Sequence, residues 1–198
     1  MTTPVTLAID TARERLQLAL ALADGSTDTE IRDVAKGHAE LIFSAITALL
    51  ERNSLAYADL DRIAVTTGPG SFTGLRIGIS AARGLGLALD SAVIGVPSLL
   101  ALSLSRSGPS ELIDDARRGE AYRQSFSAPG LPDGEPELVD LQASLQTASR
   151  ENPDDPMIDI AAMARFATTA DPARFPPDPA YIRPADAKPQ ENARVARR

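Results

Sequence analysis

The chain has 198 residues, of which 43% are hydrophobic, and carries a formal net charge of −7. It is long enough for one domain or two small lobes, and no apolar run approaches the roughly 20 residues of a membrane span. The negative charge argues against nucleic-acid binding by this chain alone, because such binding neutralises phosphates with lysine and arginine. The sequence has no cysteine, which excludes disulfides and thiolate chemistry, and we expect a cytoplasmic protein.

The first half of the chain alternates strand-like and helix-like segments. An Asp24-Gly25 turn signal between apolar runs predicts a β-meander at the start. The expected strands cover residues 5–9, 16–22, a segment after Gly25, residues 62–66 and residues 92–96. The expected helices cover residues 38–52, residues 73–89 and a segment capped by Ser98. This order predicts an α/β fold.

A glycine-rich loop joins the fourth expected strand to the second helix. It reads Thr-Gly-Pro-Gly-Ser-Phe-Thr-Gly-Leu-Arg-Ile-Gly from Thr67 to Gly78. Ser71 or Thr73 is placed to cap the helix, and free N–H groups at such a turn favour an anion or another chain. The loop fails the P-loop pattern, because five residues instead of four separate the flanking glycines and no lysine follows Gly74. It also fails the dinucleotide fingerprint by one position.

This loop resembles the signature of the TsaB (YeaZ-like) family, bacterial proteins that assist the synthesis of threonylcarbamoyladenosine in tRNA. Two later segments resemble further motifs of that family, in the same order. They are Ile113-Asp-Asp-Ala-Arg-Arg-Gly-Glu-Ala-Tyr and Tyr181-Ile-Arg-Pro-Ala-Asp-Ala. The resemblance covers nearly the whole chain and implies the two-lobed, actin-like ATPase (ASKHA) fold.

An internal repeat agrees with this fold: Ile9-Asp-Thr-Ala-Arg recurs as Ile113-Asp-Asp-Ala-Arg, each at the end of a strand-like run. The second half is short, with expected helices near 141–149 and 157–169, and it lacks a strand and a helix of the family pattern between about 146 and 156. We therefore expect an N-terminal lobe at 1–107, a shortened C-terminal lobe at 108–170 and a Pro-rich, extended tail at 171–198.

The single histidine argues against a metal enzyme. The resemblance implies that catalytic relatives hold a metal with a second histidine four residues after His38, and here that position is Ile42. A lone histidine needs distant carboxylates to complete a site, so we expect no metal ligand and a histidine at a helix N-terminus or on the surface. Glu40 then has no metal-bound water to activate, which disfavours the alternative of an M22-type metallopeptidase-like protein.

Nucleotide binding is also disfavoured. Actin-like ATPases hold phosphates between two turns rich in small residues, whereas the turns after Asp10 and Asp114 carry several arginines and acids. We expect no cofactor of its own, with weak ATP or ADP binding in a complex at most. A stand-alone actin-like ATPase or kinase stays open as an alternative. The weak candidates for cofactor binding are Ser71, Thr73, Arg76 and Arg117.

The two long helices carry the predicted partner surface. Apolar residues occupy roughly 200° of the first helix, more than the ~100° that one core covers. Small residues recur every fourth position along the second, a pattern typical of a close helix crossing. The alternative is that both helices pack only within this chain. The expected partner-binding residues are His38, Leu41, Ile42, Ala45, Ile46, Leu49, Gly74, Leu75, Gly78, Ile79, Ala82, Arg83 and Gly86.

The resemblance implies a non-catalytic subunit of the bacterial tRNA N6-threonylcarbamoyladenosine (t6A37) synthase. Its partner would be a TsaD-like catalytic subunit, with a TsaE-like ATPase in a ternary complex. We expect a homodimer when the chain is alone, tRNA contact only through the complex, and no membrane association.

Overall fold

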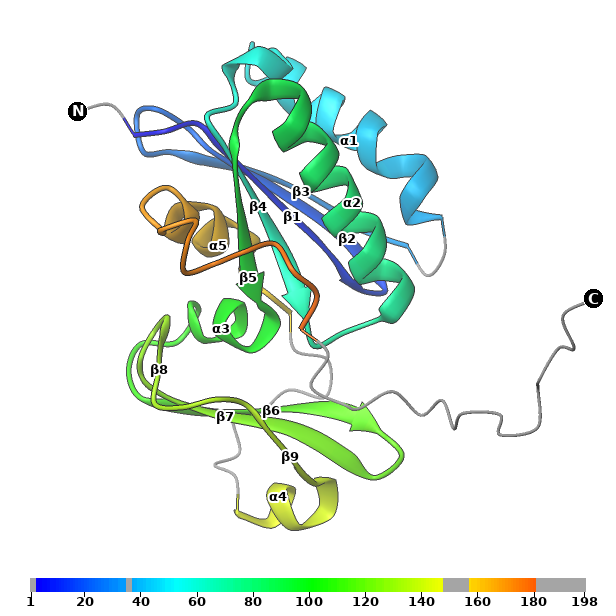
Figure 1. Ribbon diagram of the computed structural model, residues 1–198, viewed down its shortest axis with the longest axis vertical. Helices are drawn as coiled ribbons and strands as arrows, with labels where there is room; N and C mark the ends of the chain where they lie inside the picture. The colour runs from blue at the N-terminus through cyan, green and yellow to red at the C-terminus, as the bar shows by residue number, and fades with distance from the viewer. Residues whose placement is uncertain (1–2, 35–36, 148–156, 181–198) are drawn as a thin grey trace, which may run out of the picture.

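The computed structural model describes residues 3–34, 37–147 and 157–180, and it consists of a larger and a smaller β-sheet with helices around them (Figure 1). The larger sheet has five strands in the order β3-β2-β1-β4-β5. They are β1 (Thr6–Arg13), β2 (Arg15–Ala21), β3 (Thr27–Asp33), β4 (Arg62–Gly68) and β5 (Ala92–Pro97). β1, β2 and β3 are antiparallel, and β4 and β5 continue parallel to β1. The predicted meander and both parallel strands are confirmed.

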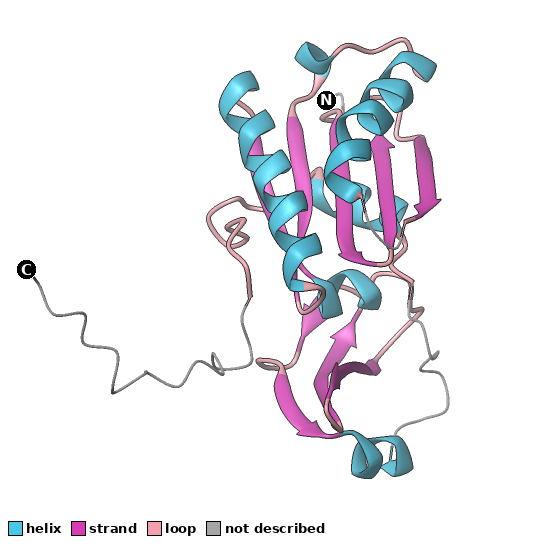
Figure 2. Ribbon diagram, turned by 90° about the vertical axis from the view of Figure 1, so that its right-hand side faces the viewer, coloured by secondary structure: helices cyan, strands magenta, loops and turns pink. Residues whose placement is uncertain are grey.

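Helices cover both faces of this sheet. α1 (His38–Arg52) and α2 (Phe72–Leu89) lie side by side on one face, and α3 (Ser98–Ser103) and α5 (Ile160–Ala167) lie on the other (Figures 1 and 2). Because strand side chains alternate, Leu7 and Ile9 enter the core beneath α1 and α2, whereas Ala8 enters the core beneath α3 and α5. A short 3₁₀ helix (Tyr57–Asp59) precedes β4.

The smaller sheet repeats the opening of the larger one. Its strands are β6 (Ser110–Arg117), β7 (Glu120–Ala128), β8 (Leu131–Pro132) and β9 (Glu137–Asp140), followed by α4 (Leu141–Thr147). β6 pairs antiparallel with β7, and β8 and β9 both pair with β7. The two copies of the Ile-Asp-x-Ala-Arg motif thus end β1 and β6, each before an antiparallel partner strand. This is the predicted α/β arrangement, in which both halves open on an antiparallel strand pair.

Three expectations need adjustment. α5 belongs to the range assigned to the C-terminal lobe, yet it packs on β1, β2 and β4 of the larger sheet, because Met163 and Ala164 are buried in that core. Ser98 is the first residue of α3 and not its cap; the N-cap is Pro97, and no side chain caps the helix. The predicted loss of a strand and a helix near 146–156 falls largely outside the described residues.

Residues 171–180 run along β5 at the edge of the larger sheet. Gly95 N donates to Phe175 O at 2.8 Å, and Ala180 N donates to Thr67 O at 2.8 Å. Phe175 also meets Phe166 of α5 edge to face. The first part of the predicted tail is therefore attached to the N-terminal lobe, and the rest lies outside the described residues. No helix in the described part of the chain is long and apolar enough to cross a membrane.

Candidate functional site

α1 begins at His38, after Gly37 in the left-handed conformation at φ 97°. The predicted helix N-terminus is confirmed, but His38 is not on the surface: its side chain is buried, with Nε2 3.2 Å from the Arg15 carbonyl oxygen. Ile42, at the second histidine position of catalytic relatives, is also buried. Among the described residues no group of three or more His, Cys, Asp or Glu side chains is arranged to hold a metal ion.

The glycine-rich loop meets the hairpin between β1 and β2. Gly68 has φ 108°, and Ser71 caps α2 by accepting from Gly74 N at 3.3 Å. The Ser71 N–H donates to Ala12 O at 2.7 Å, so the hairpin takes one of the loop's free donors. Thr11 Oγ1 donates to Gly74 O at 2.8 Å. The loop that the sequence placed against an anion or another chain is thus bonded to its own first hairpin.

The small-residue ridge of α2 also packs within this chain. A Cβ at Gly74 would collide with the Thr11 carbonyl oxygen, and one at Gly78 would collide with Thr11 Oγ1. Further along, a Cβ at Gly86 would collide with Val93 of β5. The ridge therefore lets α2 approach its own sheet closely, and this close approach accounts for the glycines within the chain.

Most of the expected partner-binding residues are buried inside the monomer. Leu41 is partly buried against the core between the larger sheet and helices α1 and α2, and Arg83 is exposed. The buried members are His38, Ile42, Ala45, Ile46, Leu49, Gly74, Leu75, Gly78, Ile79, Ala82 and Gly86. These side chains pack within the chain, as the alternative interpretation expects, because most of the apolar arc of α1 faces the sheet and α2.

A shallow groove between α1 and α2 nevertheless leaves apolar surface uncovered. It has a volume of about 560 Å³, and Phe43 and Phe72 line it with 49% and 56% of their surface exposed. Ile77 and Ala81 form its floor, and the Arg76 guanidinium lies 3.8 Å from the Phe72 ring centroid. We call this set the α1/α2 groove. Two aromatic rings in a concave site are the kind of anchor that protein interfaces use.

The sequence contained a signal for this groove that the small-residue pattern obscured. Phe72 and Leu87 lie on the same stripe of α2 as the polar Arg76 and Ser80, at 100° per residue. A large apolar residue on an otherwise polar stripe indicates exposure. Leu87 is 88% exposed, the most among the described large hydrophobic residues.

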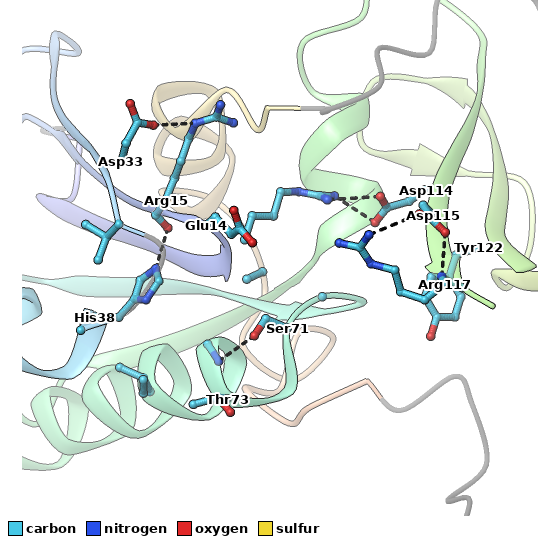
Figure 3. Close-up of a pocket in the computed structure, with 18 residues that line it drawn as sticks. Glu14, Arg15, Asp33, His38, Ser71, Thr73, Asp114, Asp115, Arg117 and Tyr122 are labelled. Carbon is cyan, nitrogen blue, oxygen red and sulfur yellow. Dashed lines mark hydrogen bonds and ion pairs between the residues drawn. The ribbon is translucent and has the colours of Figure 1, made fainter. Parts of the chain in front are cut away.

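A second hollow, of about 1240 Å³, lies between the two sheets (Figure 3). Glu14 and Arg15 of the first hairpin, Ser71 and Thr73 of the α2 start, and Asp115 of the second sheet line it. We call it the inter-lobe cleft. Its wall carries both signs of charge. Of the weak cofactor candidates, Ser71, Thr73 and Arg117 line this cleft, whereas Arg76 lies in the α1/α2 groove.

The two aspartates of the repeated motif already have partners within the chain. Asp10 is fully buried and accepts from Thr66 Oγ1 at 2.7 Å, Gln17 Nε2 at 3.0 Å and Ala12 N at 3.0 Å. Asp114 accepts two bonds from the Arg13 guanidinium, at 3.2 and 2.9 Å. Neither carboxylate therefore has both oxygens available for a ligand in the cleft.

The family model described as TsaD, tRNA N6-adenosine threonylcarbamoyltransferase, matches residues 32–172 of the chain. The chain belongs to the TsaD family. This TsaD-family chain is 35% identical over 121 residues to the tRNA threonylcarbamoyladenosine biosynthesis protein TsaB of Escherichia coli, an alignment that covers 59% of the chain and 52% of that protein. It is 38% identical over 119 residues to TsaB of Bacillus subtilis, with 59% and 52% covered. These names confirm the resemblance to TsaB.

A solved structure agrees on the fold. YeaZ from Pseudomonas aeruginosa superposes with a TM-score of 0.73 at 23% identity, covering 90% of this chain and 99% of that one. In sequence, the TsaD-family chain spans about half the length of the curated TsaB relatives that it matches.

Proposed function

We propose that this chain is a non-catalytic subunit of the t6A37 synthase, and that it binds and activates a TsaD-like catalytic subunit through the α1/α2 groove. The observation that carries the proposal is the pair of half-exposed rings, Phe43 and Phe72, in a groove on the two helices. Relatives named for threonylcarbamoyladenosine biosynthesis support the pathway. The groove replaces the buried residues expected from sequence as the site of contact.

The side-chain chemistry supports a role without catalysis. The only histidine of the sequence is buried against the Arg15 carbonyl, and a hydrophobic residue stands where a second ligand would be. The carboxylates of Asp10 and Asp114 are held by Thr66, Gln17 and Arg13, so these two motif aspartates do not form a free pair for phosphate chemistry. Weak ATP or ADP binding then belongs to the complex and not to this chain alone.

The proposed assembly rests on the family resemblance, the net charge and the exposed groove. A chain with net charge −7 meets tRNA only through its partner, in the cytoplasm, where a TsaE-like ATPase joins the complex. Without the TsaD-like subunit the same groove closes a two-fold homodimer, since exposed aromatic side chains favour self-association.

Reconstitution tests the proposal. Unmodified tRNA is incubated with ATP, threonine, bicarbonate, the donor-forming enzyme, and the TsaD-like and TsaE-like proteins, with and without this chain. We expect t6A only when the chain and the TsaD-like subunit are both present, and no ATP turnover or peptide cleavage by the chain alone. Modification by this chain without the TsaD-like subunit would contradict the non-catalytic role. Stoichiometric metal lost in a His38→Gln variant would point to a metallopeptidase-like protein.

A further inference from the structure

An ion pair joins the two lobes across the inter-lobe cleft. Arg13, at the end of β1, donates from Nη1 and Nη2 to the two carboxylate oxygens of Asp114 on β6, a partner 101 residues away in sequence (Figure 3). The side chains are only 16% and 7% exposed. A two-bond arginine–carboxylate pair fixes both distance and orientation, and burial protects it from screening by salt.

The two sheets also meet through apolar packing. Ile94 and Val96 of β5 share one buried cluster with Leu112 of β6 and Phe126 of β7, and α3 contacts both sheets. Apolar packing is not directional, so it fixes the angle between the sheets less strictly than a two-bond ion pair does. We call this cluster the apolar hinge; Arg13 and Asp114 lie outside it and line the inter-lobe cleft.

The two copies of the repeated motif place their charged side chains differently. Arg13 and Arg117 occupy the same position in the two copies of Ile-Asp-x-Ala-Arg, yet the Arg117 side chain is 84% exposed. Asp10, the counterpart of Asp114, bonds to Thr66 and Gln17 of its own sheet. Arg117 lies 3.8 Å from Asp115 of its own strand, whereas Arg13 reaches Asp114 on the other sheet.

We infer that the Arg13–Asp114 ion pair, which we call the clasp, holds the two lobes at a fixed angle without a bound ligand. It thereby also fixes the β1–β2 hairpin, against which the start of α2 packs. The hairpin bonds directly to the start of α2: Ala12 O accepts from Ser71 N, and Thr11 Oγ1 donates to Gly74 O. Release of the clasp frees the hairpin on its cleft side and loosens the first turn of α2. The inference does not depend on the proposed partner.

The absence of cysteine from the sequence permits a clean distance measurement. Spin labels are attached at Ala58→Cys in the first lobe and Glu135→Cys in the second, both at exposed positions, and the distance distribution is recorded by double electron–electron resonance. The variants are Asp114→Asn, which keeps the side-chain shape, Arg13→Gln, and the exchange Arg13→Asp with Asp114→Arg. Arg123→Gln is the matched control, because its pair with Glu137 at 2.8 Å lies within the second sheet.

We expect a single narrow distribution for the wild type and the control, a broad one for both neutral variants, and narrowing in the exchanged pair. Amide hydrogen exchange in residues 71–75 should be about tenfold faster in the neutral variants. Folded Asp114→Asn and Arg13→Gln proteins with the wild-type distribution and wild-type exchange would overturn the clasp. If either neutral variant fails to fold, the other neutral variant and the exchanged pair provide the same comparison.

Discussion

Truncation of the two rings in the α1/α2 groove tests the partner surface quantitatively. Phe43 and Phe72 are 49% and 56% exposed in the free chain. A phenylalanine side chain offers roughly 200 Å² of surface, so about 100 Å² of each ring is left for a partner to cover. At about 25 cal/mol per Å², covering it contributes about 2.5 kcal/mol per ring. Phe43→Ala or Phe72→Ala should therefore raise the Kd for the TsaD-like subunit about 60-fold.

The assay is isothermal titration of the purified TsaD-like protein into each variant, with a thermal melt of every protein. Both positions are half exposed, so neither truncation should move the melting temperature by more than a few degrees. Leu131→Ala is the matched control, because Leu131 is 58% exposed on β8 of the smaller sheet, away from the groove.

The double variant Phe43→Ala/Phe72→Ala gives the strongest test of the α1/α2 groove as the partner surface. A folded protein with both rings truncated that binds within about threefold of the wild type would show that the partner contacts another face. An equal loss in Leu131→Ala would show that general exposure of apolar surface, and not the groove, drives the association.

Three further predictions concern stability. Ile46→Glu places an unpaired charge in a fully buried site and should destabilise the monomer by at least about 3 kcal/mol in urea unfolding, unlike a surface change that weakens only the complex. Gly74→Ala should lower the melting temperature because its Cβ collides with the hairpin, whereas Gly84→Ala, with open space around it, should stabilise α2 by about 0.5–1 kcal/mol; equal effects at both glycines would refute the packing argument. Arg52 holds the pKa of Asp28 below its ordinary value mainly through a side-chain hydrogen bond. The stability that this hydrogen bond adds is present at neutral pH and is lost as the pH falls through the lowered pKa. The melting temperatures of wild type and Arg52→Gln should therefore begin to converge below about pH 4 and become equal only below the lowered pKa.

The sequence by itself determined the local structure of the N-terminal lobe. Alternation, helical periodicity and the turn signal at Asp24-Gly25 predicted all five strands and both long helices, and α1 has the bounds that were expected. Those patterns are local consequences of burying one side of a strand or helix, so a single sequence carries them. The motifs around Thr67 and Ile113 also indicated the family, because the spacing of glycines and charged residues there is specific.

Tertiary structure decided which apolar face is free. The wide apolar arc on α1 and the small-residue ridge on α2 could each pack against a partner helix or against the chain's own sheet. Periodicity does not distinguish these two packing partners. The hairpin at Thr11 packs against the ridge, and Phe43 and Phe72 are among the apolar side chains that remain exposed. Likewise, Arg13 and Asp114 are 101 residues apart in sequence. Their pairing depends on how two lobes meet, and that geometry exists only once both sheets and the apolar hinge between them have formed.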